Sequence, residues 1–163
     1  MQTPVSRTPF SISGFFGAAL SAPGLAVFLC MVGVVAAALF TTDVTKEFGS
    51  LLFGLFLFFF VATIWGAVPS VVFGGLVLVV IQRIPWPRPP GGFVFVVGGV
   101  VAAGLYVLTA LETARLSPGA AMLFAPWTAP ELTEVGELRW VAVSIVLAGA
   151  GAGLIYAGCV KRG

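Results

Sequence analysis

The sequence predicts an all-α integral membrane protein, a bundle of four transmembrane helices forming a single domain over residues 1–163. Three observations support this fold class. Hydrophobic residues make up 60% of the chain and charged residues 9%, whereas a soluble domain carries about 25% charged residues. Four long stretches lack charge, and short polar or proline-rich segments separate them. The distribution of basic and acidic residues among the segments that join these stretches also fits an even number of membrane crossings.

The stretch 51–82 is the strongest membrane signal because it contains no charged residue. As a helix it would be roughly 48 Å long, which exceeds the roughly 30 Å of the bilayer's hydrocarbon core. Pro69 lies near its middle, close to Gly66 and to the pair 74–75. A proline inside a helix removes a backbone hydrogen bond and clashes with the preceding turn. The sequence therefore predicts a long second helix that is kinked near Pro69.

The first expected span covers residues 24–40, which are uncharged and just long enough to cross a bilayer. Ser21 and Pro23 precede it, and this order is typical of a helix N-cap followed by the first turn. If residues 14–20 join the helix across Pro23, it is longer and kinked. Both versions give one crossing.

The third and fourth expected spans are residues 93–111 and 140–160. The connector 84–92 contains four prolines, which cannot continue a helix, and we expect a stiff turn there. The longest non-spanning segment is the outer loop 116–138. It is too apolar to float freely, so we expect it to lie on the membrane surface with Trp127 at the level of the lipid headgroups.

Charge placement predicts the orientation. One side carries five basic residues and no acidic ones, namely Arg7, Arg83, Arg88, Lys161 and Arg162. The other side carries all six acidic residues with three basic ones, namely Asp43, Glu47, Glu112, Glu131, Glu134, Glu137, Lys46, Arg115 and Arg139. Cytoplasmic loops are enriched in lysine and arginine. We therefore expect both termini in the cytoplasm, in a bacterial inner membrane.

Small residues spaced four apart predict close helix packing in spans one, three and four. The expected packing positions are Gly33, Ala37, Gly98, Ala102, Gly149 and Gly153. Membrane helices associate through such residues because lipid tails offer no hydrophobic driving force between helices. Residues 33–40 also resemble residues 99–106. A duplicated helical hairpin and a shared Gly/Ala/Val composition both explain this likeness.

Few side chains are suited to chemistry. The chain has no histidine, the commonest general base and the usual ligand of haem iron and catalytic zinc. Cys30 and Cys159 share no metal-binding or redox spacing, which favours two small hydrophobic residues. The net charge of +2 is too small to indicate nucleic-acid binding. The sequence therefore predicts no enzyme, no cofactor, no metal site and no nucleic-acid partner.

Three polar residues are candidate substrate or ion contacts. Glu112 lies near the end of the third span; it either pairs with Arg115 three residues later or contacts an ion or substrate. Ser70 either satisfies a carbonyl that Pro69 frees or lines a small cavity at the break in the second helix. Thr63 is one of the few other polar groups within the spans.

Three functions remain open at this stage. The leading one is a non-enzymatic accessory or structural subunit that contacts membrane lipids and forms a homo- or hetero-oligomer with other membrane proteins. The alternative is a small transporter or channel with its site at the helix break around Pro69. The third is a lipid- or quinone-binding subunit, which a lipid-sized groove between the helices would distinguish from the other two.

Overall fold

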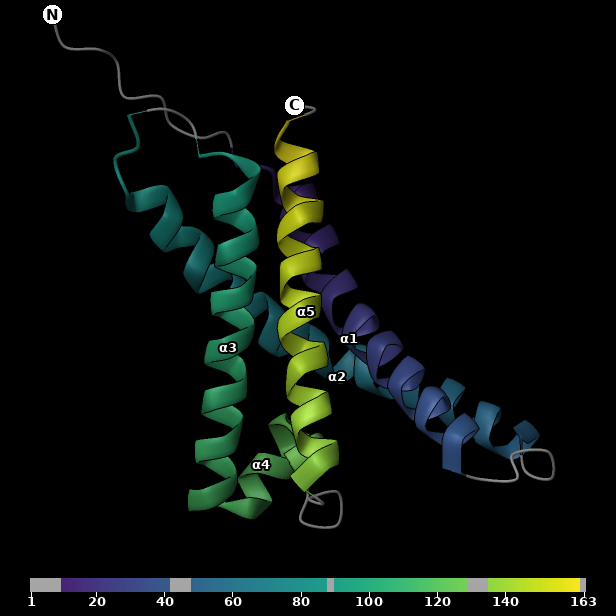
Figure 1. Cartoon of the computed structure of the whole chain (residues 1–163). Helices are drawn as coiled ribbons and strands as arrows, with labels where there is room; N and C mark the ends of the chain where they lie inside the picture. Colours follow the sequence, from purple (N-terminus) through teal and green to yellow (C-terminus); the bar gives the residue numbers. More distant parts are fainter. Residues whose placement is uncertain (1–9, 42–47, 88–89, 129–134, 162–163) are drawn as a thin grey trace, which may run out of the picture.

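The computed structural model describes residues 10–41, 48–87, 90–128 and 135–161, and all regular structure in this part of the chain is helical. The elements are α1 (Ile12–Thr41), α2 (Phe48–Arg83), α3 (Gly92–Leu116), α4 (Pro118–Phe124), the 3-10 helix η2 (Pro126–Thr128) and α5 (Val135–Val160) (Figure 1). Four segments are long and apolar enough to cross a membrane: Ile12–Gly33, Thr63–Arg83, Gly92–Leu116 and Arg139–Val160. The all-helical class and the number of spans agree with the prediction from the sequence, whereas the first span lies earlier than the predicted 24–40.

Helix α1 begins before residue 24, as in the alternative in which residues 14–20 join the helix across Pro23. Ser11 caps it, because its Oγ accepts a hydrogen bond from the backbone N–H of Gly14 at 3.1 Å. The prediction of Ser21 as the N-cap was wrong: Ser21 lies inside the helix, and its Oγ donates to the Ala18 carbonyl at 3.0 Å. The helix continues through Pro23. A membrane helix tolerates an internal proline where neighbouring helices, hydroxyl side chains or small changes in helix geometry satisfy the freed backbone groups.

Helix α2 is likewise continuous through Pro69. The hydroxyl of Ser70 donates to the Gly66 carbonyl at 2.8 Å. The carbonyl that loses its usual partner to Pro69 is that of Trp65, four residues before the proline. Ser70 thus bonds to the carbonyl next to that of Trp65, in the turn that precedes the proline, and its role in satisfying a carbonyl freed by a kink stays a prediction. The kink near Pro69 stays a prediction.

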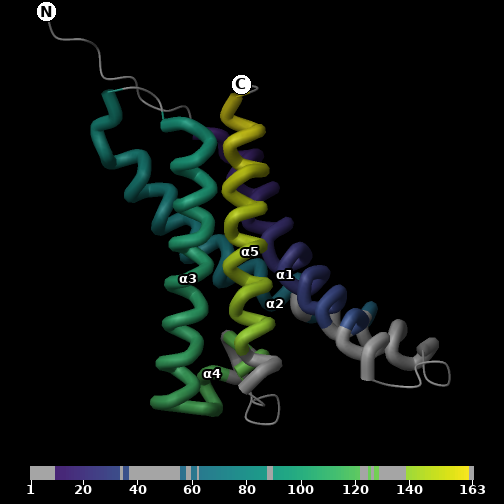
Figure 2. The backbone as a smooth tube through the Cα atoms, in the orientation of Figure 1, coloured from purple at the N-terminus to yellow at the C-terminus, as the bar shows by residue number. Residues whose placement is uncertain are grey.

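The four long helices form a closed sequence of contacts. Helices α3 and α5 lie side by side, α1 packs against α5, and α2 packs against both α1 and α3 (Figures 1 and 2). Helices α1 and α2 run at a slant to the other two. The beginning of α1 meets the end of α5, since a Cβ on Gly14 would lie 2.7 Å from the Cβ of Cys159. We call this the terminal end, and the opposite one the α4 end.

Glycines form the seam between α3 and α5. A Cβ on Gly99 would overlap the carbonyl oxygen of Gly149, and a Cβ on Gly149 would overlap that of Gly99. One turn further along, a Cβ on Gly153 would overlap the carbonyl of Phe95. Only glycine permits backbones to approach this closely, a distance at which Cα–H groups contact carbonyl oxygens.

The other expected packing positions contact different neighbours. Gly98 faces α2, where a Cβ would lie 2.7 Å from Cδ1 of Ile81. Gly33 faces α5, and Ala102 is buried. The side chain of Ala37 lies outside the described residues. The chain thus uses adjacent glycines, Gly98 and Gly99, to bring α3 close to two different helices.

A hydrophobic cluster fills the terminal end. Its members are Ala18, Leu78, Ile81, Phe95, Tyr156 and Ala157. The rings of Phe95 and Tyr156 meet edge to face with centroids 5.0 Å apart. Trp86, just beyond α2, packs against the cluster and donates its indole N–H to the Ile81 carbonyl at 2.8 Å. All four long helices contribute to this cluster, which joins them at the terminal end.

Candidate functional site

A large cleft lies between α1, α2, α3 and α5. Its volume is about 1200 Å³, compared with roughly 300–1,000 Å³ for most small-molecule pockets. Alanine and glycine dominate the walls from α1, α3 and α5, whereas α2 contributes larger side chains. None of the described residues that line the cleft is charged. The cleft is therefore suited to uncharged, apolar contents.

Two close helix contacts hold the cleft open between them. On one side, α1 meets α2 where a Cβ on Gly66 would lie only 2.5 Å from the Cβ of Pro23. On the other side, α3 meets α5 at the seam of Gly99 and Gly149. The walls between these contacts carry small residues such as Ala22 and Ala152 that do not reach across.

Aromatic side chains line the cleft toward the α4 end. Trp127 of η2 donates its indole N–H to Oη of Tyr106 on α3 at 3.0 Å, and the two rings lie edge to face with centroids 6.2 Å apart. Tyr106 also contacts the ring of Phe73 on α2 at 5.9 Å. The segment after α3 therefore turns back onto the helices instead of only covering the membrane surface. The sequence analysis did not single out Tyr106. The signal that could have indicated a hydrogen-bond partner was the indole of Trp127 within an apolar loop.

The hydrogen bond between Trp127 and Tyr106 should hold this segment in place. We expect Trp127→Phe and Tyr106→Phe each to lower the free energy of unfolding by about 1 kcal/mol, because each removes one partner of a half-buried hydrogen bond. The double variant should lose less than the sum of the two, since the second change finds the hydrogen bond between these two side chains already broken. A double-mutant cycle of unfolding in mixed detergent micelles measures this coupling. Additive losses would show that the bond contributes nothing.

Of the three candidate contacts, only Ser70 lines the cleft. Pro69 and Gly66 line it beside Ser70, as expected if the proline region of α2 borders a cavity. Thr63, one turn before Gly66, is half-buried but is not part of the lining. The role of Ser70 and Thr63 as substrate contacts stays a prediction.

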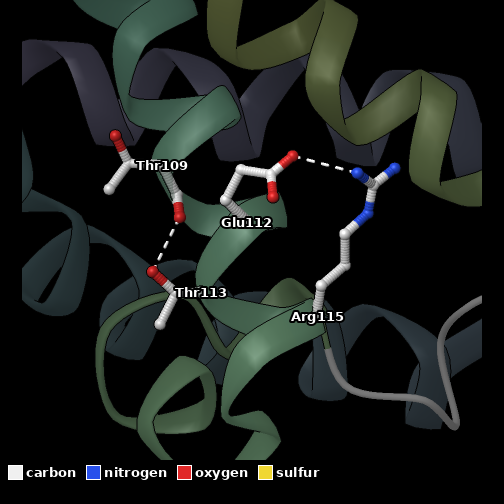
Figure 3. Close-up of polar contacts among 4 residues, drawn as sticks. All are labelled: Thr109, Glu112, Thr113 and Arg115. Atoms are coloured by element: carbon white, nitrogen blue, oxygen red, sulfur yellow. Dashed lines mark hydrogen bonds and ion pairs between the residues drawn. The ribbon is translucent and has the colours of Figure 1, made fainter.

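Glu112 lies outside the cleft. Its carboxylate accepts a hydrogen bond from Arg115 at 2.9 Å, and both side chains are exposed (Figure 3). Figure 3 also shows Thr113, whose hydroxyl donates to the Thr109 carbonyl at 2.7 Å. Such bonds satisfy threonine hydroxyls within their own helix. This arrangement matches the ion pair that the sequence offered as one reading of Glu112.

Loss of the Glu112 charge should have little effect. We expect Glu112→Gln to change the free energy of unfolding by at most about 0.5 kcal/mol, because an ion pair between two exposed side chains is weak. The same unfolding measurement, made at low and high salt, checks this. A loss several times larger would mean that Glu112 has a partner beyond Arg115.

A buried hydroxyl lies at the contact between α1 and α5. Ser144 is 0% exposed, and its Oγ has no hydrogen bond of acceptable geometry within the described part of the chain. The thiol of Cys30 approaches it from α1, but a thiol is a weak hydrogen-bonding group. We expect Ser144→Ala to leave stability unchanged or to raise it by up to about 1 kcal/mol, because it removes an unsatisfied polar group. A clear loss of stability in unfolding experiments would reveal a partner for this hydroxyl.

Few polar groups line the cleft. Among the described residues, no group of three or more histidines, cysteines or carboxylates could hold a metal ion. The polar groups that line the cleft are hydroxyls, a thiol and indole N–H groups. No protein-family model, no curated protein and no solved structure shows significant similarity to the chain.

Proposed function

We propose that this protein is a non-catalytic accessory protein of the membrane that holds the hydrocarbon chain of a lipid between its helices. The observation that carries this proposal is the cleft of about 1200 Å³ with no charged lining residue. A charged or strongly polar molecule would lose its hydration there without gaining a partner. A hydrocarbon chain has no such hydration to lose, and the surrounding bilayer contains many such chains.

The sequence left three functions open. A lipid-sized groove between the helices is the feature that distinguishes lipid binding from the other two. As an accessory protein, the chain would also contact other membrane proteins or further copies of itself. In support, α2 presents a row of exposed apolar side chains that includes Phe56, Phe60 and Ile64. The rings of Phe56 and Phe60 meet edge to face with centroids 4.9 Å apart. This outward face of α2 is separate from the cleft.

Lipid retention tests the proposal. The protein is purified in a mild detergent, exchanged repeatedly into fresh detergent to remove loosely held lipid, and examined by native mass spectrometry. We expect a defined small number of lipid molecules to stay bound to each chain. A chain that is free of lipid after the first exchange, yet still folded by circular dichroism, would contradict the proposal.

We further propose that both termini lie in the cytoplasm and that the protein belongs to a bacterial inner membrane. The excess of basic residues at the terminal end supports this orientation, with Arg83 and Lys161 both following candidate spans at that end. Cysteine-reactive reagents that do not cross the membrane test it on tags at each terminus. Labelling of either tag in intact cells would contradict it.

A small transporter is the second candidate, and one observation favours it. Pro69 and Ser70 line the cleft in the middle of α2, where a change in helix geometry would alter its width. Glu112 lies outside the cleft, so a transporter would have to move an uncharged solute. Flux of small uncharged solutes into liposomes, compared with empty liposomes, tests this. Equal flux in both would leave lipid binding as the function.

A further inference from the structure

The part of α2 that lines the cleft is exposed at one end and buried at the other. Val61 and Trp65 line the cleft near the α4 end, and they are 48% and 45% exposed. Pro69 lines it further along the helix and is buried. Leu78 and Ile81, the last lining residues of α2, are also buried. The cleft is therefore more open beside the beginning of this stretch than beside its end.

Helix α5 shows the same change in exposure. Trp140 lines the cleft toward the α4 end and is 43% exposed. Ala148 lines the middle and Tyr156 the terminal end, and both are buried. Since two different helices agree, the cleft is open at the α4 end of the bundle and closed at the terminal end.

Four side chains close the terminal end, one from each long helix. They are the residues at which the described lining of each helix ends, namely Phe15, Ile81, Phe95 and Tyr156. We call these four residues the floor of the cleft. Three of them belong to the buried cluster of the terminal end, and Phe15 packs against that cluster. Trp86 and Val160 also pack against the cluster. A hydrocarbon chain in the cleft would therefore meet packed side chains at the floor.

The distance from the opening to the floor exceeds the thickness of one lipid leaflet. Trp140 and Tyr156 are separated by roughly 24 Å along the axis of α5, given the rise of an α-helix per residue. One leaflet contributes half of a hydrocarbon core that is roughly 30 Å thick. A lipid chain that enters at the α4 end therefore passes the middle of the bilayer before it reaches the floor.

We infer that a lipid chain enters the cleft from the α4 end with its terminal methyl group leading, and that the floor sets the chain length that fills the cleft. This inference rests on the lipid binding proposed above and adds the residues that determine which chains are held best. A shorter chain leaves part of the walls without contacts, and each missing contact reduces the van der Waals attraction. A longer chain gains nothing, because its excess stays outside the opening.

A series of lysophosphatidylcholines, each with one saturated chain, tests the inference. Delipidated full-length protein in mild detergent is titrated with the lauroyl, myristoyl, palmitoyl, stearoyl, arachidoyl and behenoyl forms. Native mass spectrometry gives the dissociation constant of each. We expect the affinity to rise with chain length and then to level off at a plateau, once the chain reaches the floor.

Two variants should move the start of this plateau in opposite directions. Phe95→Leu removes a ring from the floor and should shift the plateau toward longer chains by at least one member of the series. Ala152 lines the cleft on α5, one turn before Tyr156. Ala152→Leu should therefore raise the floor and shift the plateau toward shorter chains. Circular dichroism confirms that each variant is folded.

Phe93→Leu is the matched control. Phe93 lies on the same helix as Phe95, but it is exposed and does not line the cleft. The same substitution at this position should leave the plateau where it is in the wild-type protein.

The results that would overturn the inference differ in what else they affect. An affinity that does not depend on chain length, or that rises without levelling off, would leave lipid binding intact but remove the role of the floor. A plateau that does not move in folded Phe95→Leu or Ala152→Leu, or that moves in Phe93→Leu, would do the same. Binding of no member of the series would overturn the proposed function and this inference together.

Discussion

The Gly149→Ala variant should be less stable than the wild-type protein by about 1–3 kcal/mol, the typical cost of placing an extra group into a packed interior. A Cβ at this position would overlap the Gly99 carbonyl and lie 2.7 Å from the Cβ of Ala103. Because the first of these neighbours is backbone, α3 and α5 must move apart to relieve the overlap. Unfolding in mixed micelles of a mild detergent and dodecyl sulfate measures the loss.

Gly158→Ala is the matched control on the same helix. A Cβ there would meet nothing within 4 Å, and alanine favours a helix over glycine by up to about 1 kcal/mol. We therefore expect this variant to be as stable as the wild-type protein or slightly more so. If both variants behaved alike, the α3–α5 seam would not be a close backbone contact, and one wall of the cleft would lose its support.

Filling the cleft should abolish most lipid binding without unfolding the protein. Gly74 lines the cleft, and a Cβ on it would make only an ordinary contact of 3.8 Å with Phe15. A tryptophan at this position would project into space that the lipid chain needs. The ring would exclude part of the lipid chain and remove its van der Waals contacts with the walls of the cleft. Retained lipid, measured by native mass spectrometry, should fall at least severalfold in Gly74→Trp.

Gly104→Trp provides the comparison for this second prediction. Gly104 lies on α3 and does not line the cleft, and a Cβ added to it would meet no atom within 4 Å. It receives the same large side chain at a place where no lipid chain is proposed. Lipid retention in this variant should equal that of the wild-type protein. Equal retention in both tryptophan variants would show that the bound lipid lies elsewhere.

The helical class and the four spans could be predicted because each depends on a local property of the chain. A stretch without charge, such as residues 51–82, must be helical in hydrocarbon whatever its neighbours are. The start of α1 was left between two alternatives for a related reason. Ser21 and Pro23 form a helix-start pattern in water, but the longer alternative agrees with the structure, in which the helix passes through them and begins at Ile12 after the cap Ser11.

The cleft could not be predicted in the same way, because it depends on which faces of different helices meet. The pattern of small residues showed that close packing was available, but not that Gly99 contacts Gly149 while Gly98 contacts Ile81. Nor did it show that Pro23 packs on Gly66. One alternative from the sequence was a small cavity at the predicted helix break beside Pro69, and Ser70 does line the cleft.

Photo-crosslinking from a lipid chain tests the central claim most directly. A lipid with a diazirine in its chain is incorporated in membranes, the protein is extracted and freed of surrounding lipid by detergent exchange, and the sample is then irradiated. Mass spectrometry should find adducts on cleft-lining residues such as Phe73, Leu78 and Ala102. Adducts found only on outward-facing residues such as Val68 and Phe93, which are 69% and 78% exposed, would contradict a lipid chain between the helices.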